Sequence, residues 1–127
     1  MTTANLVLVV DDDPSTRQSV ARLLRVRGLD AAVFGSGEEL LARADLRTAL
    51  CAVLDIQLPG ISGIQLRRQL AGMQAALPVI FITANDTDAT RRSAEEAGCV
   101  AYLSKPFTQQ TLSDAVDVAV ASRRRAG

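Results

Sequence analysis

The chain has 127 residues, with 14 basic and 14 acidic side chains and therefore no formal net charge. This length suits one domain that buries its core without disulfides or a structural metal. A balanced charge supplies no basic face for nucleic acid, so we expect no direct DNA contact by this segment. The apolar stretches are too short to span a bilayer, and no basic residue precedes the first of them. These features argue against a secretory signal and predict a cytoplasmic chain without membrane contact.

Short apolar runs alternate along the chain with segments of helical character. Because the runs are nearly continuous rather than alternating, they suit a parallel sheet that is covered on both faces by crossover helices. The predicted fold class is therefore α/β, with a strand and a helix repeated five times. The predicted strands are residues 6–10, 31–34, 51–54, 79–83 and 100–103.

Helix-start and helix-end signals separate the first three strands. Asp13 and Pro14 give the first helix an N-cap and a proline in its first turn, and Gly28 would end it. Ser36 and Glu39 have the spacing of a capping box for the second helix. These signals predict one helix after each strand.

The third and fifth helices also have clear start signals, whereas the fourth is less well defined. Ser62 follows Pro59-Gly60 and would cap the third helix, and Thr108 follows Lys105-Pro106 and would cap the fifth. Residues 86–97 offer only alanines at their apolar positions, so we expect the fourth helix to be the least firmly packed. The fifth helix is predicted to have an apolar face formed by Leu112, Ala115, Val116 and Ala119.

The two cysteines, Cys51 and Cys99, do not have the spacing of a metal-binding or redox pair. The chain contains no histidine, so neither a zinc site nor a cysteine–histidine pair can be completed. Free cysteines of this kind usually behave as small buried apolar residues. We predict that both are core residues.

Polar side chains gather at the predicted carboxyl ends of four strands. Asp11 and Asp12 follow the first strand, Asp55 follows the third, Thr83 ends the fourth, and Lys105 lies two residues after the fifth. In an open parallel α/β sheet, ligands bind beyond the carboxyl ends of the strands, where the strand order reverses. Each residue alone could be a cap, a turn residue or a surface charge, but their common location predicts one shared site.

Three carboxylates in one crevice require a cation. At 4 Å, each pair would repel by about 4 kcal/mol at an effective dielectric constant of 20. Oxygen ligands without histidine or cysteine indicate a hard ion, and a few carboxylates with retained waters fit Mg²⁺ better than Ca²⁺. Lys105 is the only lysine among the 14 basic residues, which favours a specific role for a compact charge at this position.

Several motifs resemble the receiver domains of response regulators from bacterial two-component systems. The resemblance covers practically the whole chain and is closest to the nitrogen-fixation-regulator-type branch, whose members usually carry a C-terminal helix-turn-helix DNA-binding domain. It implies a flavodoxin-like (βα)5 three-layer sandwich with strand order 2-1-3-4-5. The motifs are VVDDD at 9–13, LD at 54–55 with Pro59-Gly60 and Gly63, FITA at 81–84, and Ala97-Gly98 followed by YLSKPF at 102–107.

By this resemblance, Asp55 is the phosphoacceptor that takes a phosphoryl group from a sensor histidine kinase. Asp12 and Asp55 would bind Mg²⁺ directly, Asp11 would act mainly through water, and the backbone carbonyl of Gln57 would complete the protein ligands. The chain would then be a regulatory phosphoacceptor rather than an enzyme with an external substrate. Its catalysis would consist of positioning and charge neutralisation.

The resemblance also assigns the phosphoryl-binding and switch residues. Thr83 and the Ala84 amide would hold phosphoryl oxygens, and Lys105 would pair with another. When Thr83 moves toward the phosphoryl group, Tyr102 would fill the vacated space and rearrange the face of the fourth helix, fifth strand and fifth helix. We expect this face to form a homodimer on phosphorylation. The bond between Lys105 and Pro106 is predicted to be cis.

Two further expectations concern kinetics and boundaries. Gln57 and Asn85 lie two residues after Asp55 and Thr83, near the predicted path of an attacking water, and would set the phosphoryl lifetime. Gln57 is also expected among the phosphoryl-binding residues. Residues 1–122 are predicted to form the receiver domain, and the basic residues 123–127 to be a tail or the start of a linker to an output domain outside this chain.

Three competing interpretations fit the residues less well. A phosphatase of the haloacid-dehalogenase class needs a second acid two residues after its nucleophile, where this chain has Gln57. A flavodoxin-like nucleotide binder needs a phosphate-binding loop after its first strand, where aspartates would repel phosphate. A degenerate receiver that serves only as a protein-interaction or dimerisation module is the remaining alternative, although Asp12, Asp55 and Lys105 are all retained.

Overall fold

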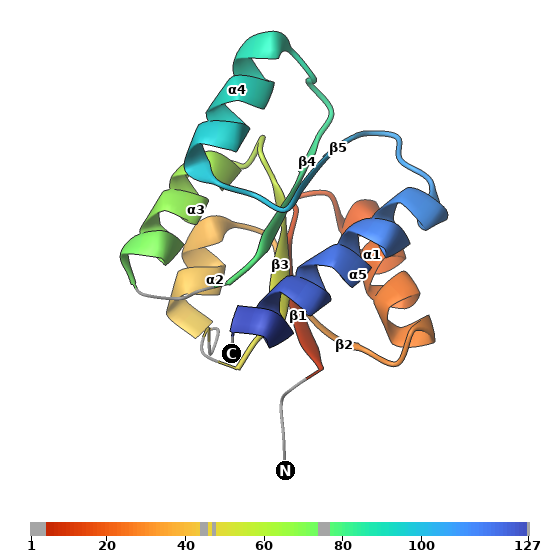
Figure 1. The fold of residues 1–127 in the computed structure, drawn as a ribbon. Coiled ribbons are helices and arrows are strands. Elements are labelled where there is room, and N and C mark those ends of the chain that lie inside the picture. Colours follow the sequence, from red (N-terminus) through yellow and green to blue (C-terminus); the bar gives the residue numbers. More distant parts are fainter. Residues whose placement is uncertain (1–4, 44–45, 47, 74–76, 127) are drawn as a thin grey trace.

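The computed structural model describes residues 5–43, 46, 48–73 and 77–126. Within these residues, five strands form one parallel sheet in the order β2-β1-β3-β4-β5, which confirms the predicted flavodoxin-like order (Figure 1). The strands are β1 (Leu6–Val10), β2 (Asp30–Phe34), β3 (Cys51–Asp55), β4 (Val79–Thr83) and β5 (Ala101–Ser104). The helices are α1 (Pro14–Val26), α2 (Gly37–Arg43), α3 (Gly63–Gly72), α4 (Asp88–Ala97) and α5 (Gln109–Ala126).

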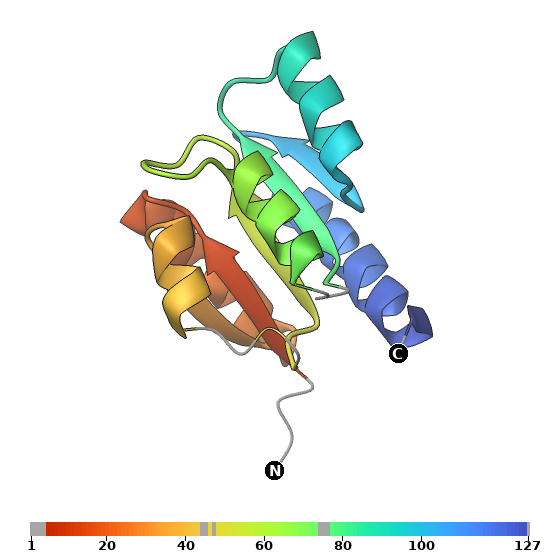
Figure 2. The same ribbon diagram turned by 90° about the vertical axis from the view of Figure 1, so that its left-hand side faces the viewer.

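The helices form a layer on each face of the sheet. Figures 1 and 2 show α2, α3 and α4 on one face and α1 and α5 on the other. Successive side chains of a strand point to opposite faces, so Leu8 of β1 packs in the same cluster as Leu66 of α3. Its neighbour Val7 instead packs with Val20 of α1 and Val116 of α5. Burial on both faces explains why the strands are almost continuously apolar.

The strand boundaries differ from the predicted ones by one residue in three places. β2 begins at Asp30, whose backbone pairs with Leu6. β5 lies one residue later than predicted and ends at Ser104, which pairs with Thr83. β3 extends to include Asp55. Each added residue is polar and was therefore left out of the predicted apolar run. Backbone pairing continues for as long as the partner strand offers hydrogen bonds, whatever the side chain is.

α1 and α3 begin with side-chain caps at the predicted positions. An Asp13 carboxylate oxygen accepts a hydrogen bond from the Ser15 amide at 3.0 Å and caps α1. Ser62 caps α3 and forms a full capping box with Gln65, with reciprocal bonds of 3.1 and 2.9 Å. This box was missed in the sequence, although Gln65 has the required spacing from Ser62.

The predicted capping box of α2 is only half formed. The Ser36 hydroxyl accepts from the Glu39 amide at 3.1 Å as expected. The Glu39 carboxylate, however, accepts from the Gly35 amide at 3.1 Å instead of from Ser36. At the last helix, Thr108 caps α5 as predicted by accepting from the Thr111 amide at 3.0 Å.

The last two helices differ in how firmly they pack. α4 begins at Asp88, after its cap Thr87, and Ala94 is its one buried residue, as expected for a loosely packed helix. Its sequence provides no large apolar side chain that could reach the core. In α5 the predicted apolar face is confirmed, since the residues buried there include Leu112, Ala115, Val116 and Ala119.

The prediction that both cysteines belong to the core is only partly right. Cys51 is fully buried in β3, and its burial raises the pKa of the thiol to about 12. Cys99 is half-buried at the edge of the core, between α4 and β5. Among the described residues, none of the helices combines the length and apolar character that a membrane crossing requires.

Candidate functional site

The candidate site lies where the strand order of the sheet reverses. β1 lies between β2 and β3, and the helices that follow β1 and β3 lie on opposite faces of the sheet. Asp11 directly follows β1, and Asp55 is the last residue of β3. Such a reversal leaves a crevice beyond the strand ends. The predicted carboxylates therefore lie at the position where this fold binds its ligands.

Three aspartates form one carboxylate cluster, and Lys105 lies against it. Asp11, Asp12 and Asp55 each place a carboxylate oxygen within 4.8 Å of the others. Asp11 and Asp55 are buried, whereas Asp12 is exposed. The Lys105 ammonium group donates to Asp11 Oδ2 at 2.9 Å and to Asp55 Oδ2 at 3.0 Å. The prediction that these four side chains meet agrees with this arrangement.

Backbone amides hold the remaining oxygens of the two buried carboxylates. Asp11 Oδ1 accepts from the Asp13 amide at 2.9 Å, and Asp55 Oδ1 accepts from the Gln57 amide at 2.9 Å. Each buried carboxylate is therefore fixed by one backbone donor and by Lys105. The bond between Lys105 and Pro106 is cis, as predicted.

Burial and charge act against each other at Asp55 and Lys105. Burial raises the pKa of Asp55, and the hydrogen bond from Lys105 only partly offsets it. Burial alone would lower the pKa of Lys105. The hydrogen bonds that Lys105 donates to Asp11 and Asp55, together with the charges of these carboxylates, outweigh that effect, so the pKa of Lys105 is raised. Lys105 is thus charged at neutral pH and partly neutralises the two buried carboxylates.

The donor set fits a hard divalent cation. Three carboxylates and one ammonium group leave a local excess of about two negative charges when all are ionised. The carboxylate of Asp12 is exposed beside the two that Lys105 already contacts. Oxygen ligands in this number, open to water on one side, suit Mg²⁺.

Thr83 and Ala84, at the end of β4, contact the loop after Asp55. The Thr83 hydroxyl donates to Gln57 Oε1 at 2.8 Å, and the Ala84 amide donates to the same oxygen at 3.3 Å. Thr83 Oγ1 also accepts from the Asn85 amide at 3.0 Å. The Gln57 side chain, predicted to lie near the phosphoryl group and the path of an attacking water, thus contacts both Thr83 and Ala84.

Comparison with known proteins identifies the family of the chain. The family model of the response regulator receiver domain matches residues 7–117. The chain belongs to this family. Nodulation protein W from Bradyrhizobium diazoefficiens is 42% identical over 97% of this chain and 54% of its own length. The transcriptional regulatory protein TdiR from Thauera aromatica is 36% identical over 95% of this chain and 53% of its own length.

Solved structures support the same assignment. Response regulator StyR superposes on this receiver domain with a TM-score of 0.84 and 38% identity, over 95% of this chain and 63% of that chain. FIXJ-N gives a TM-score of 0.83 and 32% identity, over 91% of this chain and 93% of that chain. The chain spans about half the length of the curated relatives it matches.

Tyr102, the predicted switch residue of the receiver domain, is held by two residues that the sequence did not point to. Its hydroxyl donates to Asp86 Oδ1 at 3.0 Å, and the Arg91 guanidinium lies 4.5 Å from the ring centroid. Arg91 also pairs with Asp86 at 3.2 Å. Partial burial, followed by the bond to Asp86, raises the pKa of Tyr102 to about 12, so the hydroxyl stays protonated and donates at neutral pH.

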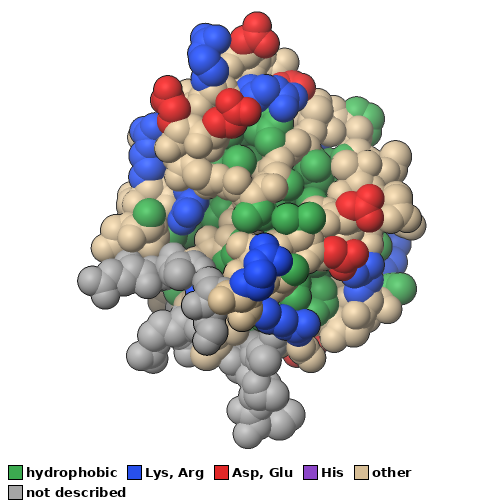
Figure 3. Space-filling model, viewed as in Figure 1, with side chains coloured by type: hydrophobic (Ala, Val, Ile, Leu, Met, Phe, Trp, Pro, Cys, Tyr) green, Lys and Arg blue, Asp and Glu red, His purple; other side chains and the backbone are tan. Residues whose placement is uncertain are grey.

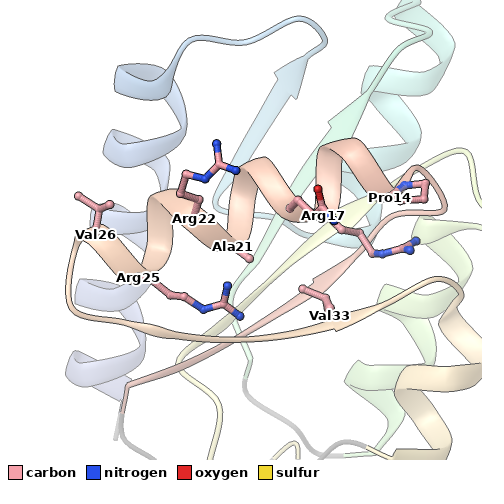
Figure 4. Close-up of a pocket in the computed structure, with 8 residues that line it drawn as sticks. Pro14, Arg17, Ala21, Arg22, Arg25, Val26 and Val33 are labelled. Carbon is pink, nitrogen blue, oxygen red and sulfur yellow. The ribbon is translucent and has the colours of Figure 1, made fainter.

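Two cavities lie near the site without containing the carboxylate cluster. A groove of about 610 Å³ runs between α1 and β2, and Figure 4 shows Arg17, Arg22 and Arg25 along it. Arg17 connects it to the site, because its guanidinium donates to the backbone carbonyl of Asp11 at 2.7 Å. A second cavity of about 420 Å³ lies between α1 and the loop of Lys105.

Proposed function

We propose that this receiver domain accepts a phosphoryl group on Asp55 from the phosphohistidine of a sensor histidine kinase. The observation that best supports the proposal is the contact of one ammonium group, that of Lys105, with the carboxylates of both Asp11 and Asp55. This contact places a fixed positive charge beside the proposed nucleophile at the ligand-binding edge of the sheet. A phosphoryl group on Asp55 would find a cation already in position.

The transfer needs little covalent chemistry from the protein. A carboxylate oxygen of Asp55 attacks the phosphorus, the bond from phosphorus to the histidine nitrogen breaks, and the histidine keeps that electron pair. The product is an acyl phosphate. Lys105 pairs with one phosphoryl oxygen, while the Thr83 hydroxyl and the Ala84 amide bind others. Orientation and charge stabilisation by these fixed groups supply the rate enhancement.

The carboxylate cluster is the proposed Mg²⁺ site. Asp12 and Asp55 would bind the ion directly, Asp11 would act mainly through water, and the backbone carbonyl of Gln57 would be the remaining protein ligand. When bound, the ion neutralises charge on the phosphoryl oxygens during transfer. A module that only mediates interactions would not need this set, so the intact cluster favours phosphorylation over the alternative of a degenerate receiver.

Millimolar Mg²⁺ is expected to stabilise the unphosphorylated domain against thermal unfolding. Binding to the folded state alone adds about 2.7 kcal/mol when the free ion exceeds its Kd a hundredfold. For a domain of this size, that corresponds to a rise in Tm of about 10 °C. Asp12→Ala should remove most of the rise, because Asp12 supplies the exposed ligand of the cluster. Calorimetric scans with Mg²⁺ or EDTA measure the effect.

Asp30→Ala is the matched control for the metal test. Asp30 is exposed like Asp12. It lies at the start of β2, however, at the amino ends of the strands and not at the carboxyl ends, where the cluster lies. The variant should keep the full stabilisation by Mg²⁺. Equal midpoints with and without the ion in the unsubstituted protein would contradict the proposed metal site.

The proposal of an output domain is supported by the length of the curated relatives. Because the chain spans about half the length of its curated relatives, one of them a transcriptional regulatory protein, we place an output domain after residue 122. In this proposal, residues 1–122 form the phosphoacceptor domain and Arg123 begins the connection to the output domain. α5 continues as a helix through this basic segment, so the connection would start as a helical extension.

The proposed output is a change in the face formed by α4, β5 and α5. In Figure 3, which shows this side, apolar side chains lie between α4 and α5, with charged side chains of both signs around them. Thr83 is buried at the end of β4, and Tyr102 lies in β5, the strand that pairs with β4. Movement of Thr83 toward a phosphoryl oxygen opens space for Tyr102, and loosely packed α4 can follow. To shift the ratio of active to inactive conformation from 1:99 to 99:1, the phosphoryl group must stabilise the active conformation by about 5.5 kcal/mol more than the inactive one.

A stable phosphoryl mimic is expected to convert the domain from monomer to homodimer. Sedimentation at micromolar protein concentration, with Mg²⁺ and with or without beryllofluoride, should show the increase in mass. Thr83→Ala should suppress the increase, because it removes the hydroxyl that responds to the phosphoryl group, whereas Thr83→Ser should retain it. An unchanged mass in the unsubstituted protein would exclude dimerisation of this segment as the output.

A further inference from the structure

The side chain of Gln57 occupies the two donors that the proposed function assigns to phosphoryl oxygens. Gln57 Oε1 accepts from the Thr83 hydroxyl at 2.8 Å and from the Ala84 amide at 3.3 Å. A backbone N–H can only donate, so the carboxamide oxygen, and not its nitrogen, must face Ala84. We propose that the Gln57 carboxamide is an internal competitor of the phosphoryl group, which must displace it from Thr83 and Ala84. This inference rests on the proposed phosphorylation of Asp55.

Thr83 cannot donate to Gln57 and to a phosphoryl oxygen at the same time. Thr83 is fully buried, and its oxygen already accepts from the Asn85 amide at 3.0 Å. A threonine hydroxyl has a single hydrogen to donate, and here that hydrogen goes to Gln57. Thr83 therefore cannot donate to a phosphoryl oxygen until its bond to Gln57 breaks. The Gln57 bond also holds Thr83 in its unphosphorylated position.

The Gln57 side chain can leave without disturbing the phosphoacceptor. Gln57 is exposed, so its carboxamide can rotate out into the solvent. Its backbone amide remains bonded to Asp55 Oδ1 at 2.9 Å, which keeps the loop and the carboxylate in place. Displacement then exchanges two hydrogen bonds within the protein for bonds to water. The Gln57 side chain therefore blocks the two donors reversibly, and the position of Asp55 does not depend on it.

The competition should be measurable but not prohibitive. A neutral hydrogen bond of this kind changes an equilibrium by about twofold to tenfold. Bonds from the same donors to a charged phosphoryl oxygen are roughly twice as strong. The phosphoryl group therefore wins, and Gln57 lowers its apparent affinity by a limited factor.

Beryllofluoride binding to the Mg²⁺-loaded domain tests this inference. Gln57→Met keeps the length of the side chain and removes its strong acceptor. We expect its Kd for beryllofluoride, measured by isothermal titration calorimetry, to be about threefold to tenfold lower than that of the unsubstituted protein. Gln110→Met is the matched control, because Gln110 is exposed on α5 and its side chain donates to Asp114. The control should leave the Kd unchanged.

A double-mutant cycle separates competition from a general loosening of the loop. In a Thr83→Ala background the hydroxyl hydrogen is absent, so Gln57→Met should improve the Kd by a smaller factor than it does alone. An equal gain in both backgrounds would contradict the proposed route through Thr83. An unchanged or higher Kd for Gln57→Met, while the unsubstituted protein binds the mimic, would overturn the inference and leave the proposed function standing. No binding by the unsubstituted protein, or equal binding by Asp55→Asn, would overturn both.

Discussion

Asp55→Asn is expected to reduce phosphoryl incorporation from acetyl phosphate or a cognate kinase to background. Loss of an enzyme's nucleophile typically costs at least about three orders of magnitude in rate, and a carboxamide is no nucleophile here. The substitution preserves the shape of the side chain. Its carboxamide oxygen can still accept from the Gln57 amide, whereas the bond that Asp55 accepts from Lys105 is lost. The loss should therefore occur in a folded domain. Intact-protein mass spectrometry after incubation with Mg²⁺ and phosphodonor measures it.

A neighbouring aspartate provides the control for this experiment. Asp13 accepts from the Ser15 amide and the Thr16 hydroxyl at 3.0 Å each and serves as the cap of α1. Asparagine is as good a cap as aspartate, so Asp13→Asn should keep both fold and phosphorylation. Incorporation that persists in Asp55→Asn, or that is insensitive to EDTA in the unsubstituted protein, would rule out Asp55 with Mg²⁺ as the phosphoacceptor site.

Gly63→Ala is expected to destabilise the domain by about 3 kcal/mol or more, the upper range for inserting an atom into close-packed structure. A Cβ at Gly63 would lie 2.3 Å from the carbonyl oxygen of Asp55 and 2.9 Å from the Cα of Ile56. Both are backbone atoms, one at the end of β3 and one in the loop after it, so no side-chain rotation can relieve the contact. The Gly63 amide also donates to the Ile56 carbonyl at 3.0 Å, which holds α3 against this loop. Chemical denaturation measures the loss.

Gly72→Ala, in the same helix, is the matched control. A Cβ at Gly72 would have no atom within 4 Å. Alanine is the better helix former, so this variant should be stabilised by up to about 1 kcal/mol. If the two substitutions change the free energy of unfolding in opposite directions, the Gly63 effect comes from the close backbone contact and not from helix propensity. Equal effects would refute the steric explanation.

The alternation of apolar runs and caps predicted most of the fold correctly, because these signals are local. Asp13 and Ser62 cap helices where expected, and the apolar face of α5 is buried as expected. The deviations arise where a partner strand decides. Asp30 and Ser104 are polar, yet they join the sheet because their backbones pair with neighbouring strands. Composition carries no information about that pairing.

The sequence by itself determined the fold class and the set of carboxylates at the strand ends. Both depend on features within a few residues: the burial pattern of each strand, and the polar residue that follows it. A parallel sheet then brings the ends of neighbouring strands together, so Asp11 and Asp55 had to meet near Lys105.

Only the tertiary structure decided which side chains fill the spaces around that cluster. Gln57 reaches Thr83 across 26 positions of sequence because Asp55 pairs with Ile82, which puts the two following loops side by side. The links from Tyr102 to Asp86 and Arg91 likewise join the end of β4, α4 and β5. Such contacts depend on strand register and side-chain rotamers at once. No pattern of neighbouring residues encodes either of them.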